Sequence, residues 1–405
     1  MSPKSYVVAL DVGGTSMKGG LVASDGEVLL TDRRPTPRDE GPQRVIEAIR
    51  TFIDDLARSG RTLPSPTTPT DTTAPTPRTP PTAGGSPGTA PRTPLTPGRP
   101  SGGTGTSFIS DVPYGTGTPF TSGRPSGGPE SPVTSGMPAG VGLAVPGLVN
   151  SDTALYAANI GWKDVPATEF TSLDVPVRLG HDVRTGGLAE RVLGAGRSEP
   201  DFLFLPIGTG IAGASIVHGE PYGGSAGWGG EIGHIPVFPD GERCACGQVG
   251  CLETYASAAS VARRYSERLS RAASLRSLTP PLTGPAPAAE DVVALAMRGD
   301  PHASAVWDEA LEALSLALAS YTLLLDPSSI VIGGGLAEAG PALFEPLAER
   351  LQSRLGFRPA PPLRHAALGM NAGMLGAALL GWQAAGIPDV GSTWALDVLR
   401  SPSVP

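Results

Sequence analysis

Residues 5–23 read SYVVALDVGGTSMKGGLVA. The two apolar runs of this stretch, Ser5–Leu10 and Met17–Ala23, predict a strand that turns and returns as a second strand. The turn between them contains Asp11, Gly13, Gly14 and Thr15. Glycines let backbone N–H groups approach a phosphate closely, and the threonine adds a hydroxyl group. A plain hairpin explains the same residues equally well, so this motif alone leaves both interpretations open.

Two charged side chains of the same stretch can serve a bound nucleotide. Asp11, at the end of the first strand, can hold the water ligands of a Mg²⁺ ion. Lys18 faces either the same phosphates or the solvent.

A second part of the chain repeats this pattern. The apolar run Phe202–Ile207 and the returning strand Ala212–Val217 enclose another turn, which contains Gly208, Thr209 and Gly210. Two such hairpins in one chain suggest two related halves, each offering a phosphate-binding turn.

A third glycine motif follows the strand predicted at Ile330–Ile332. It consists of Gly333, Gly334 and Gly335 and precedes a helix expected from Leu336. A glycine triplet between a strand and a helix allows a flat ligand such as adenine to lie against the backbone. Close packing of the strand on the helix is the alternative explanation.

The spacing of apolar residues predicts several helices, and one long segment differs in composition from the rest of the chain. Helices are predicted at residues 42–59, 256–272, 288–298 and 302–325. From Pro64 to Pro138, 57 of 75 residues are Pro, Thr, Ser or Gly, too polar a composition to offset the entropy of ordering. We therefore expect a disordered insertion within a domain, which costs the fold only about 2 kcal/mol of loop-closure entropy.

Two polar residues follow the strand predicted at Val175–Leu179. They are His181 and Asp182, and a helix is expected from Gly186 to Gly194. Polar groups at the C-terminal end of a strand, just before a helix, lie where open α/β sheets bind ligands. Asp182 is well placed to act as a general base, although a helix N-cap is the simpler alternative for an aspartate there.

Carboxylate, imidazole and thiol groups meet in the stretch 229–253, GGEIGHIPVFPDGERCACGQVGCLE. Glu231 and His234 lie one helical turn apart, and all three cysteines of the chain follow within eight positions as C-x-C-x4-C, namely Cys244, Cys246 and Cys251. An odd number of cysteines argues against a disulfide framework and for a reducing compartment. Three thiolates and one imidazole form a tetrahedral ligand set for Zn²⁺, so His234 is the expected fourth ligand.

Composition limits the class of protein. The net charge of −8 and the absence of any basic run argue against nucleic-acid binding. The N-terminal apolar run is short and ends in Asp11, so it predicts a strand rather than a signal peptide. The apolar segment Ala366–Trp382 is broken by Asn371, which favours a buried helix over a membrane span. We expect a cytoplasmic protein with no membrane or nucleic-acid partner.

Taken together, these motifs resemble those of the ROK family of sugar kinases and related repressors. The resemblance rests on DVGGT, GLAVPGLV, NIGW, GTGIAG, GGEIGH, CACGQVGCLE and IVIGGG, which occur in the family's order. It implies a two-domain α/β fold of the actin-like ATPase class (ribonuclease H-like, hexokinase superfamily). The expected N-terminal lobe comprises residues 1–63 and 139–180, and the C-terminal lobe comprises 181–386 with a zinc loop at 234–251. Residues 387–405 form an unassigned tail.

The resemblance also implies a reaction. Asp182 would remove the proton of a sugar hydroxyl as it attacks the γ-phosphate of ATP, with Mg²⁺ neutralising charge. Asn159, Glu231, His234 and Glu253 would hold the other hydroxyls, and the three glycine motifs would bind ATP. Zn²⁺ would be structural, and a homodimer or homotetramer is expected. Glucose, giving glucose 6-phosphate, is the first candidate substrate, with other hexoses and another phosphoryl donor as alternatives.

One position departs from the family pattern. The residue before the catalytic aspartate is usually an asparagine that contacts a sugar hydroxyl, and here it is His181. Imidazole is larger and has a different donor and acceptor set, so the sugar or its orientation is open. A sugar-sensing transcriptional regulator or a non-catalytic sensor is the rival interpretation. We expect the kinase, because DVGGT starts at residue 11 with no DNA-binding domain before it and because Asp182 is retained.

Overall fold

The structure is a computed structural model, and it describes residues 4–62, 136–276 and 287–394. The insertion predicted at Pro64–Pro138 lies outside these ranges except for its last three residues. In that part, the Gly136 carbonyl accepts a hydrogen bond from the Tyr6 hydroxyl at 3.0 Å.

Two five-stranded sheets form the body of the protein. The first has the order β3-β2-β1-β4-β8 and the second β11-β10-β9-β12-β13. The first sheet comprises β1 (Tyr6–Val12), β2 (Ser16–Ala23), β3 (Val28–Pro35), β4 (Val141–Val145) and β8 (Val177–His181). The second comprises β9 (Phe202–Pro206), β10 (Ala214–Val217), β11 (Glu220–Tyr222), β12 (Ser329–Gly333) and β13 (Leu363–His365).

The two sheets share one topology. In each, the first three strands in the chain form an antiparallel meander, and two later strands pair in parallel with its first strand and then with each other. This common strand order confirms the two related halves predicted from the repeated hairpin.

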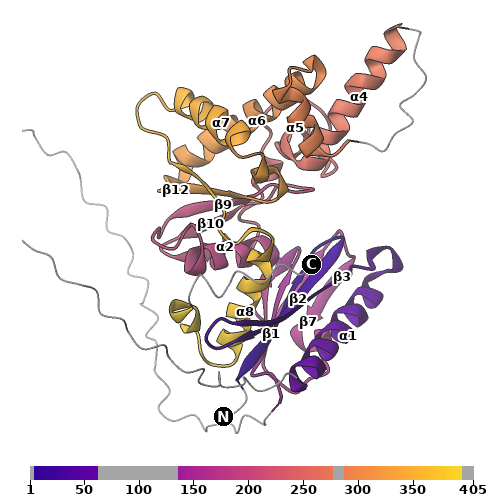
Figure 1. The fold of residues 1–405 in the computed structure, drawn as a ribbon, viewed down its shortest axis with the longest axis vertical. Coiled ribbons are helices and arrows are strands. Elements are labelled where there is room, and N and C mark those ends of the chain that lie inside the picture. Colours follow the sequence, from indigo (N-terminus) through magenta and orange to yellow (C-terminus); the bar gives the residue numbers. More distant parts are fainter. Residues whose placement is uncertain (1–3, 63–135, 277–286, 395–405) are drawn as a thin grey trace, which may run out of the picture. The chain divides into compact units, whose positions relative to one another are not determined.

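Alternation along β1 shows why this strand is a continuous apolar run. Val8 and Leu10 face one core, which includes helix α1 (Pro42–Arg61), while Val7 and Ala9 face another, which includes helix α8 (Ala372–Ala384). Because both faces are covered, neither set of side chains can be polar. Figure 1 shows α1 and α8 on opposite faces of this sheet.

The second sheet is also covered on both faces. Leu203 and Leu205 of β9 pack into the core formed by the helices that follow the cysteine loop, whereas Phe202 and Phe204 face the core that contains Val183 and Ala372. The remaining helices are α2 (Asp182–Leu193), α3 (Glu253–Ala256), α4 (Ala258–Arg276), α5 (Ala289–Met297), α6 (Pro301–Leu325) and α7 (Pro341–Arg354).

Several elements were not predicted from the sequence. Besides β3 and β13, a small three-stranded sheet forms from β5 (Leu148–Val149), β6 (Thr153–Ala157) and β7 (Trp162–Pro166). The helix after His181 begins at Asp182, four residues before the predicted start at Gly186. In the stretch assigned to a C-terminal tail, Trp394 is 1% exposed, and its indole N–H donates to the Ser24 carbonyl at 3.1 Å.

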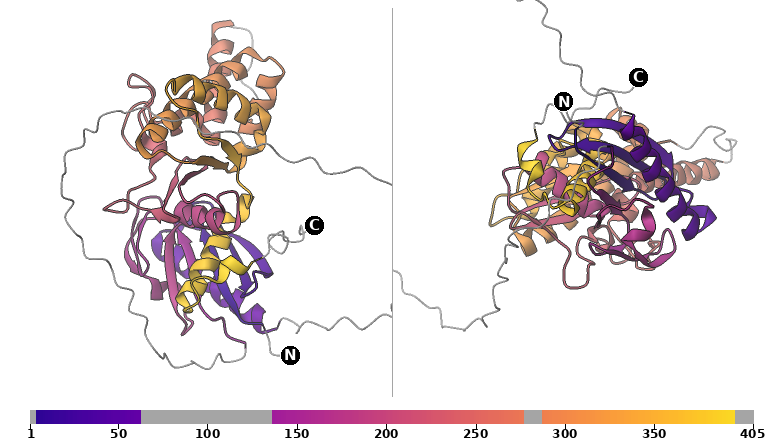
Figure 2. Two further views of the ribbon diagram at one scale, coloured as in Figure 1. Left: turned by 90° about the vertical axis from the view of Figure 1, so that its left-hand side faces the viewer. Right: turned by 90° about the horizontal axis from the view of Figure 1, so that it is seen from below.

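Helix α8 returns the chain to the first sheet. It packs against β1, β4 and β8 and against α2, and Figures 1 and 2 show α8 beside α2. A Cβ atom at Gly142 of β4 would lie 1.8 Å from the Ala377 carbonyl oxygen, so this close approach requires glycine. The buried helix expected in Ala366–Trp382 is present from Ala372 onward as α8, and the six residues before it lie outside this helix. Among the described residues, no helix is long and apolar enough to cross a membrane.

Candidate active site

The first glycine turn joins β1 to β2 and is closed by the end of β3. The Thr36 hydroxyl donates to the Gly13 carbonyl at 2.7 Å, and the Thr36 N–H donates to the Thr15 carbonyl at 3.1 Å. Asn159 lies beside this turn, since a Cβ atom at Gly14 would lie 3.7 Å from its side-chain nitrogen. The structure therefore brings a predicted sugar contact and a predicted phosphate motif together. Thr36 was not identified from the sequence.

Asp11 lies at this turn with its carboxylate largely enclosed. Burial raises its pKa to about 6, against the opposing charge of Lys18. The Lys18 ammonium donates to the Met370 carbonyl at 3.0 Å, so it ties β2 to the segment that precedes α8. Gly373, in the first turn of α8, leaves room for Asp11: a Cβ atom there would lie 2.3 Å from Oδ2 of the carboxylate. This role of Gly373 was not predicted, because it depends on the contact between α8 and β1.

His181 and Asp182 stand at the junction of β8 and α2. His181 is the N-cap, and its Nδ1 atom accepts from the Arg184 N–H at 3.5 Å. Asp182 is the first helical residue, and its carboxylate accepts from the Val183 N–H at 2.7 Å. Because His181 fills the capping position, the N-cap alternative for Asp182 does not hold. The Asp182 side chain is 29% exposed and can be reached by a substrate.

Charges around Asp182 come from three segments of the chain. Burial is the largest influence and raises the pKa of Asp182 to about 7; Asp11 and Glu231 raise it further, whereas the Val183 N–H and Arg184 lower it. Two other carboxylates, Asp11 and Glu231, are thus close enough to raise the pKa of Asp182. A carboxylate with a pKa near neutrality is suited to accept and release a proton at physiological pH.

His181 contributes no charge to this group. Burial, together with the nearby Arg184, lowers the pKa of His181 to about 3. The imidazole is therefore neutral at physiological pH and can act only as a hydrogen-bonding group.

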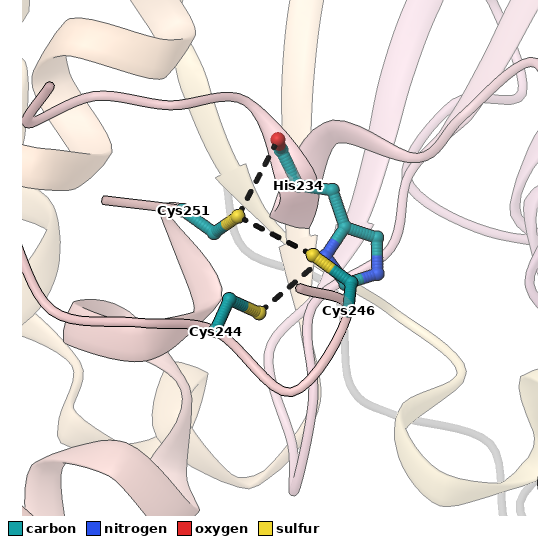
Figure 3. Close-up of side chains that lie close together, drawn as sticks. All are labelled: His234, Cys244, Cys246 and Cys251. Atoms are coloured by element: carbon teal, nitrogen blue, oxygen red, sulfur yellow. Dashed lines mark hydrogen bonds between the residues drawn. The ribbon is translucent and has the colours of Figure 1, made fainter. Parts of the chain in front are cut away.

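His234 connects the carboxylate and thiol parts of its stretch. Its Nε2 atom lies 3.8 Å from Oε2 of Glu231, and its Nδ1 atom lies 3.9 Å from Sγ of Cys244. Figure 3 shows Cys244, Cys246 and Cys251 converging on the same side of the imidazole. One ring nitrogen thus faces the cysteines and the other faces Glu231, the arrangement expected for a histidine shared between a metal and a hydroxyl-binding site.

The four predicted metal ligands form one cluster. Ligand atoms of His234, Cys244, Cys246 and Cys251 all lie within 4.8 Å of one another, and the three cysteines are free thiols. Two thiolates on a tetrahedral Zn²⁺ at about 2.3 Å are roughly 3.8 Å apart. The Cys246 and Cys251 sulfurs are 3.7 Å apart, so the residues present fit Zn²⁺. Gly250 has a φ of 77°, a turn that other residues rarely make.

The second glycine turn lies against Glu253. The Glu253 carboxylate accepts from the Ile211 N–H at 2.8 Å, and a Cβ atom at Gly210 would lie 2.6 Å from the same oxygen. Glu253 therefore contacts the backbone of the turn formed by Gly208, Thr209 and Gly210. This contact was not anticipated for a residue predicted to bind the sugar.

The third glycine motif adjoins the second. Ile207 donates its N–H to the Gly333 carbonyl at 2.8 Å, and a Cβ atom at Gly334 would lie 2.4 Å from the Ile207 carbonyl oxygen. Gly334 is therefore required for close backbone packing, whereas a Cβ atom at Gly333 would meet only the side chains of Ala366 and Phe204, at 3.1 and 3.2 Å. A Cβ atom at Gly208 or Gly335 would meet no protein atom within 4 Å, which leaves these two positions open to a ligand.

Arg184 is the charged residue near the site that sequence reasoning missed. It lies in the first turn of α2, and its guanidinium donates to the carbonyls of Gly227 and Gly229. A cation in the first helical turn opposes the helix dipole, and that unusual position is a signal the sequence did contain.

The two sheets share one strand order, and each has a glycine turn in its first hairpin. These features define a two-domain α/β protein of the actin-like class. The comparison with known families then gives a direct assignment. The chain belongs to the ROK family, which matches residues 7–65 and 133–384.

Individual relatives are kinases named for different sugars. The chain is 35% identical to a glucokinase of Halalkalibacterium halodurans over 248 residues, which cover 60% of this chain and 74% of the relative. It is 33% identical to an N-acetyl-D-glucosamine kinase of Escherichia coli O6:H1 over 254 residues, which cover 59% and 79%. The crystal structure of a ROK hexokinase from Thermus thermophilus matches with a TM-score of 0.61 at 26% identity, covering 93% of this chain and 98% of that one. The identity of the sugar is therefore not fixed by similarity.

Proposed function

We propose that this protein is an ATP-dependent sugar kinase that phosphorylates a hexose, with glucose and glucose 6-phosphate as the first candidates for substrate and product. The observation that carries the proposal is the placement of Asp182. Its carboxylate has a pKa near 7. The charges of two other carboxylates help to raise that pKa: Asp11, which belongs to the first glycine turn, and Glu231, which lies near the cysteine loop. The glucokinase relative supports the choice of glucose, and the N-acetyl-D-glucosamine kinase supplies the main alternative.

In the proposed reaction, Asp182 accepts the proton of the attacking sugar hydroxyl. The residual partial exposure of its carboxylate allows contact with the sugar, and its pKa allows proton release after transfer. Phosphoryl transfer depends mainly on positioning and on neutralising charge. The protein supplies the positioning through the turn at Gly13, Gly14 and Thr15 and through the second turn at Gly208, Thr209 and Gly210.

The nucleotide would be held by these turns and by the third glycine motif. Gly208 and Gly335 offer open backbone, whereas Gly333 and Gly334 fix the strand against the second turn. Asp11 would hold the water ligands of Mg²⁺, which supplies charge neutralisation at the phosphates when bound. Lys18 is held by the Met370 carbonyl in the structure, so in this proposal it acts near the phosphates only through its charge.

The sugar hydroxyls would be held by residues from three segments: Asn159, His181, Glu231, His234 and Glu253. Glu231 and His234 carry the best geometrical support, because the imidazole lies between the carboxylate and the thiols. Glu253 already binds the Ile211 N–H through one carboxylate oxygen, so the other oxygen is the one we assign to the sugar.

Zn²⁺ would be structural in this protein. Three thiolates and one imidazole complete a tetrahedral set and leave no position for a substrate. Its role would be to fix the loop that carries His234. Free thiols agree with a reducing, cytoplasmic setting, and a homodimer or homotetramer is the assembly we propose, to be measured by light scattering after size exclusion.

The test is a panel of hexoses with ADP release coupled to a spectrophotometric readout. Glucose, N-acetylglucosamine, N-acetylmannosamine, mannose and fructose are compared at saturating ATP and Mg²⁺, with polyphosphate as an alternative donor. We expect turnover of at least one hexose, with glucose the best. If the protein binds sugar without turning any over, it is a sensor and the kinase proposal is wrong.

A further inference from the structure

Arg184 connects two segments that carry different parts of the proposed chemistry. It lies two residues after Asp182 in α2, so its backbone moves with the proposed base. One of its guanidinium nitrogens, Nη1, donates to the carbonyl oxygens of Gly227 and Gly229, at 3.1 Å in each case. Gly229 stands two residues before Glu231, so a single side chain links the base to the approach to a proposed sugar contact.

The segment that Arg184 holds is a closed loop, residues 223–230, which we term the glycine loop. The Gly229 N–H donates to the Gly223 carbonyl at 2.9 Å and closes its base. The Gly213 N–H donates to the Gly230 carbonyl at 2.7 Å and attaches the loop to the segment before β10. A Cβ atom at Gly223 would lie 3.7 Å from the guanidinium carbon of Arg184, so the side chain lies against the loop backbone.

The position of Arg184 is energetically unfavourable for a cation unless hydrogen bonds compensate it. The N-terminal end of a helix repels a cation, and burial lowers the pKa of Arg184. In the described part of the chain, no carboxylate hydrogen-bonds to Arg184, and Asp182 and Glu231 attract it only through longer-range Coulomb forces. The two loop carbonyls are its direct partners, so the contact with the glycine loop accounts for its placement.

We infer that Arg184 is a positioning residue, which fixes Glu231 relative to Asp182 by holding the glycine loop against the first turn of α2. This inference rests on the proposed function, because it assigns Glu231 to the sugar and Asp182 to the proton. The guanidinium itself need not touch the substrate. Its removal should loosen the loop and weaken binding of the sugar more than binding of the nucleotide.

The experiment compares Arg184→Gln and Arg184→Lys with the unmutated protein and with Arg191→Gln. Arg191 is a matched control, since it lies on the same helix and its guanidinium also donates to a backbone carbonyl, that of Arg197 at 3.0 Å. Hydrogen exchange followed by mass spectrometry reports on peptides that span the glycine loop, with peptides of β9 as an internal reference. Steady-state kinetics give KM for the sugar and for ATP separately.

For Arg184→Gln we expect faster exchange in the glycine loop and a sugar KM raised about tenfold, because two hydrogen bonds from a charged donor are lost. The KM for ATP should stay within about twofold. Arg184→Lys should restore much of the sugar KM, because an ammonium can also donate to two carbonyls. Arg191→Gln should change neither measurement.

Unchanged exchange in the loop, or an unchanged sugar KM, in Arg184→Gln would overturn the inference. So would a rise in both KM values together with a fall in melting temperature, since that pattern indicates general destabilisation. If the unmutated protein phosphorylates no hexose, the proposed function fails separately. The dissociation constant for glucose, measured by calorimetry, then replaces KM, and the exchange data still decide whether Arg184 holds the loop.

Discussion

The Nδ1 atom of His181 lies 3.1 Å from Oδ1 of Asp182, at the point where β8 becomes α2. The same nitrogen accepts from the Arg184 N–H at 3.5 Å. Since Nδ1 is engaged on the protein side, Nε2 is the ring atom left for a substrate. The residue that departs from the family pattern thus lies directly beside the proposed base.

Replacing His181 by asparagine should change the sugar preference more than the chemistry. A side-chain amide donates and accepts at once, whereas the neutral imidazole offers one remaining nitrogen. We expect His181→Asn to raise the ratio of kcat/KM for glucose over N-acetylglucosamine about tenfold. A change of this size is typical when one contact in a substrate pocket is altered. Competing turnover assays with the two sugars measure the ratio, and an unchanged ratio would show that His181 does not contact the sugar.

The activity should depend on the protonation of Asp182. Its pKa is raised to about 7, so below that pH the carboxyl group is protonated and cannot accept the hydroxyl proton. We expect kcat/KM to rise with pH and level off above a midpoint near 7. His181 titrates at about 3 and cannot produce such a midpoint.

Asp182→Asn tests the same assignment. It should lower kcat by at least about a hundredfold, because a positioned general base is lost, while glucose still binds. Asp174→Asn, an exposed aspartate just before β8, is the control and should leave both unchanged. Retained turnover in Asp182→Asn would place the base elsewhere.

Removing one thiol should release the metal and weaken the sugar site. Cys246 is the exposed ligand of the cluster, so Cys246→Ser disturbs core packing less than changes at the buried Cys244 or Cys251. We expect elemental analysis to show that the bound zinc is lost. The glucose dissociation constant should rise about tenfold, because groups that orient a binding side chain typically contribute at least that factor to affinity. ATP binding should persist.

Ala245→Ser is the matched control, because it adds the same hydroxyl group at the neighbouring exposed position. It should keep its zinc and its affinity for glucose. An unmutated protein that contains no zinc would refute the link between the metal and His234.

A methyl group at Gly373 should displace the Asp11 carboxylate. Its Cβ atom would lie 2.3 Å from Oδ2 and 2.5 Å from Cγ of Asp11, so the carboxylate must shift. We expect Gly373→Ala to lower kcat about tenfold to a hundredfold through misplacement near the phosphates, with little change in glucose affinity. The Mg²⁺ concentration needed for half-maximal rate should rise. Gly356→Ala, whose Cβ atom would meet nothing within 4 Å, is the control, and equal rates in the two variants would contradict the prediction.

Prediction from sequence succeeded where a few neighbouring residues determine the outcome. The glycine turns after β1 and β9, the apolar strands and the C-x-C-x4-C ligand spacing are local features, and the structure contains each of them. The edge strand β3 was missed because none of its residues is buried, and the edge strand β13 was missed because it has only 3 residues.

The sequence by itself determined the two related halves, the glycine turns and the cluster of His234 with the three cysteines, since each depends on backbone freedom, side-chain periodicity or residue spacing within a short stretch. Only the tertiary structure decided that Asp11 and Glu231 lie close enough to act on Asp182, that His181 and not Asp182 caps α2, and that the Arg184 side chain hydrogen-bonds to the glycine loop. Those relationships depend on how distant segments pack. Proximity of this kind sets burial, and burial sets the pKa of a carboxylate, so neither can be obtained from the order of residues alone.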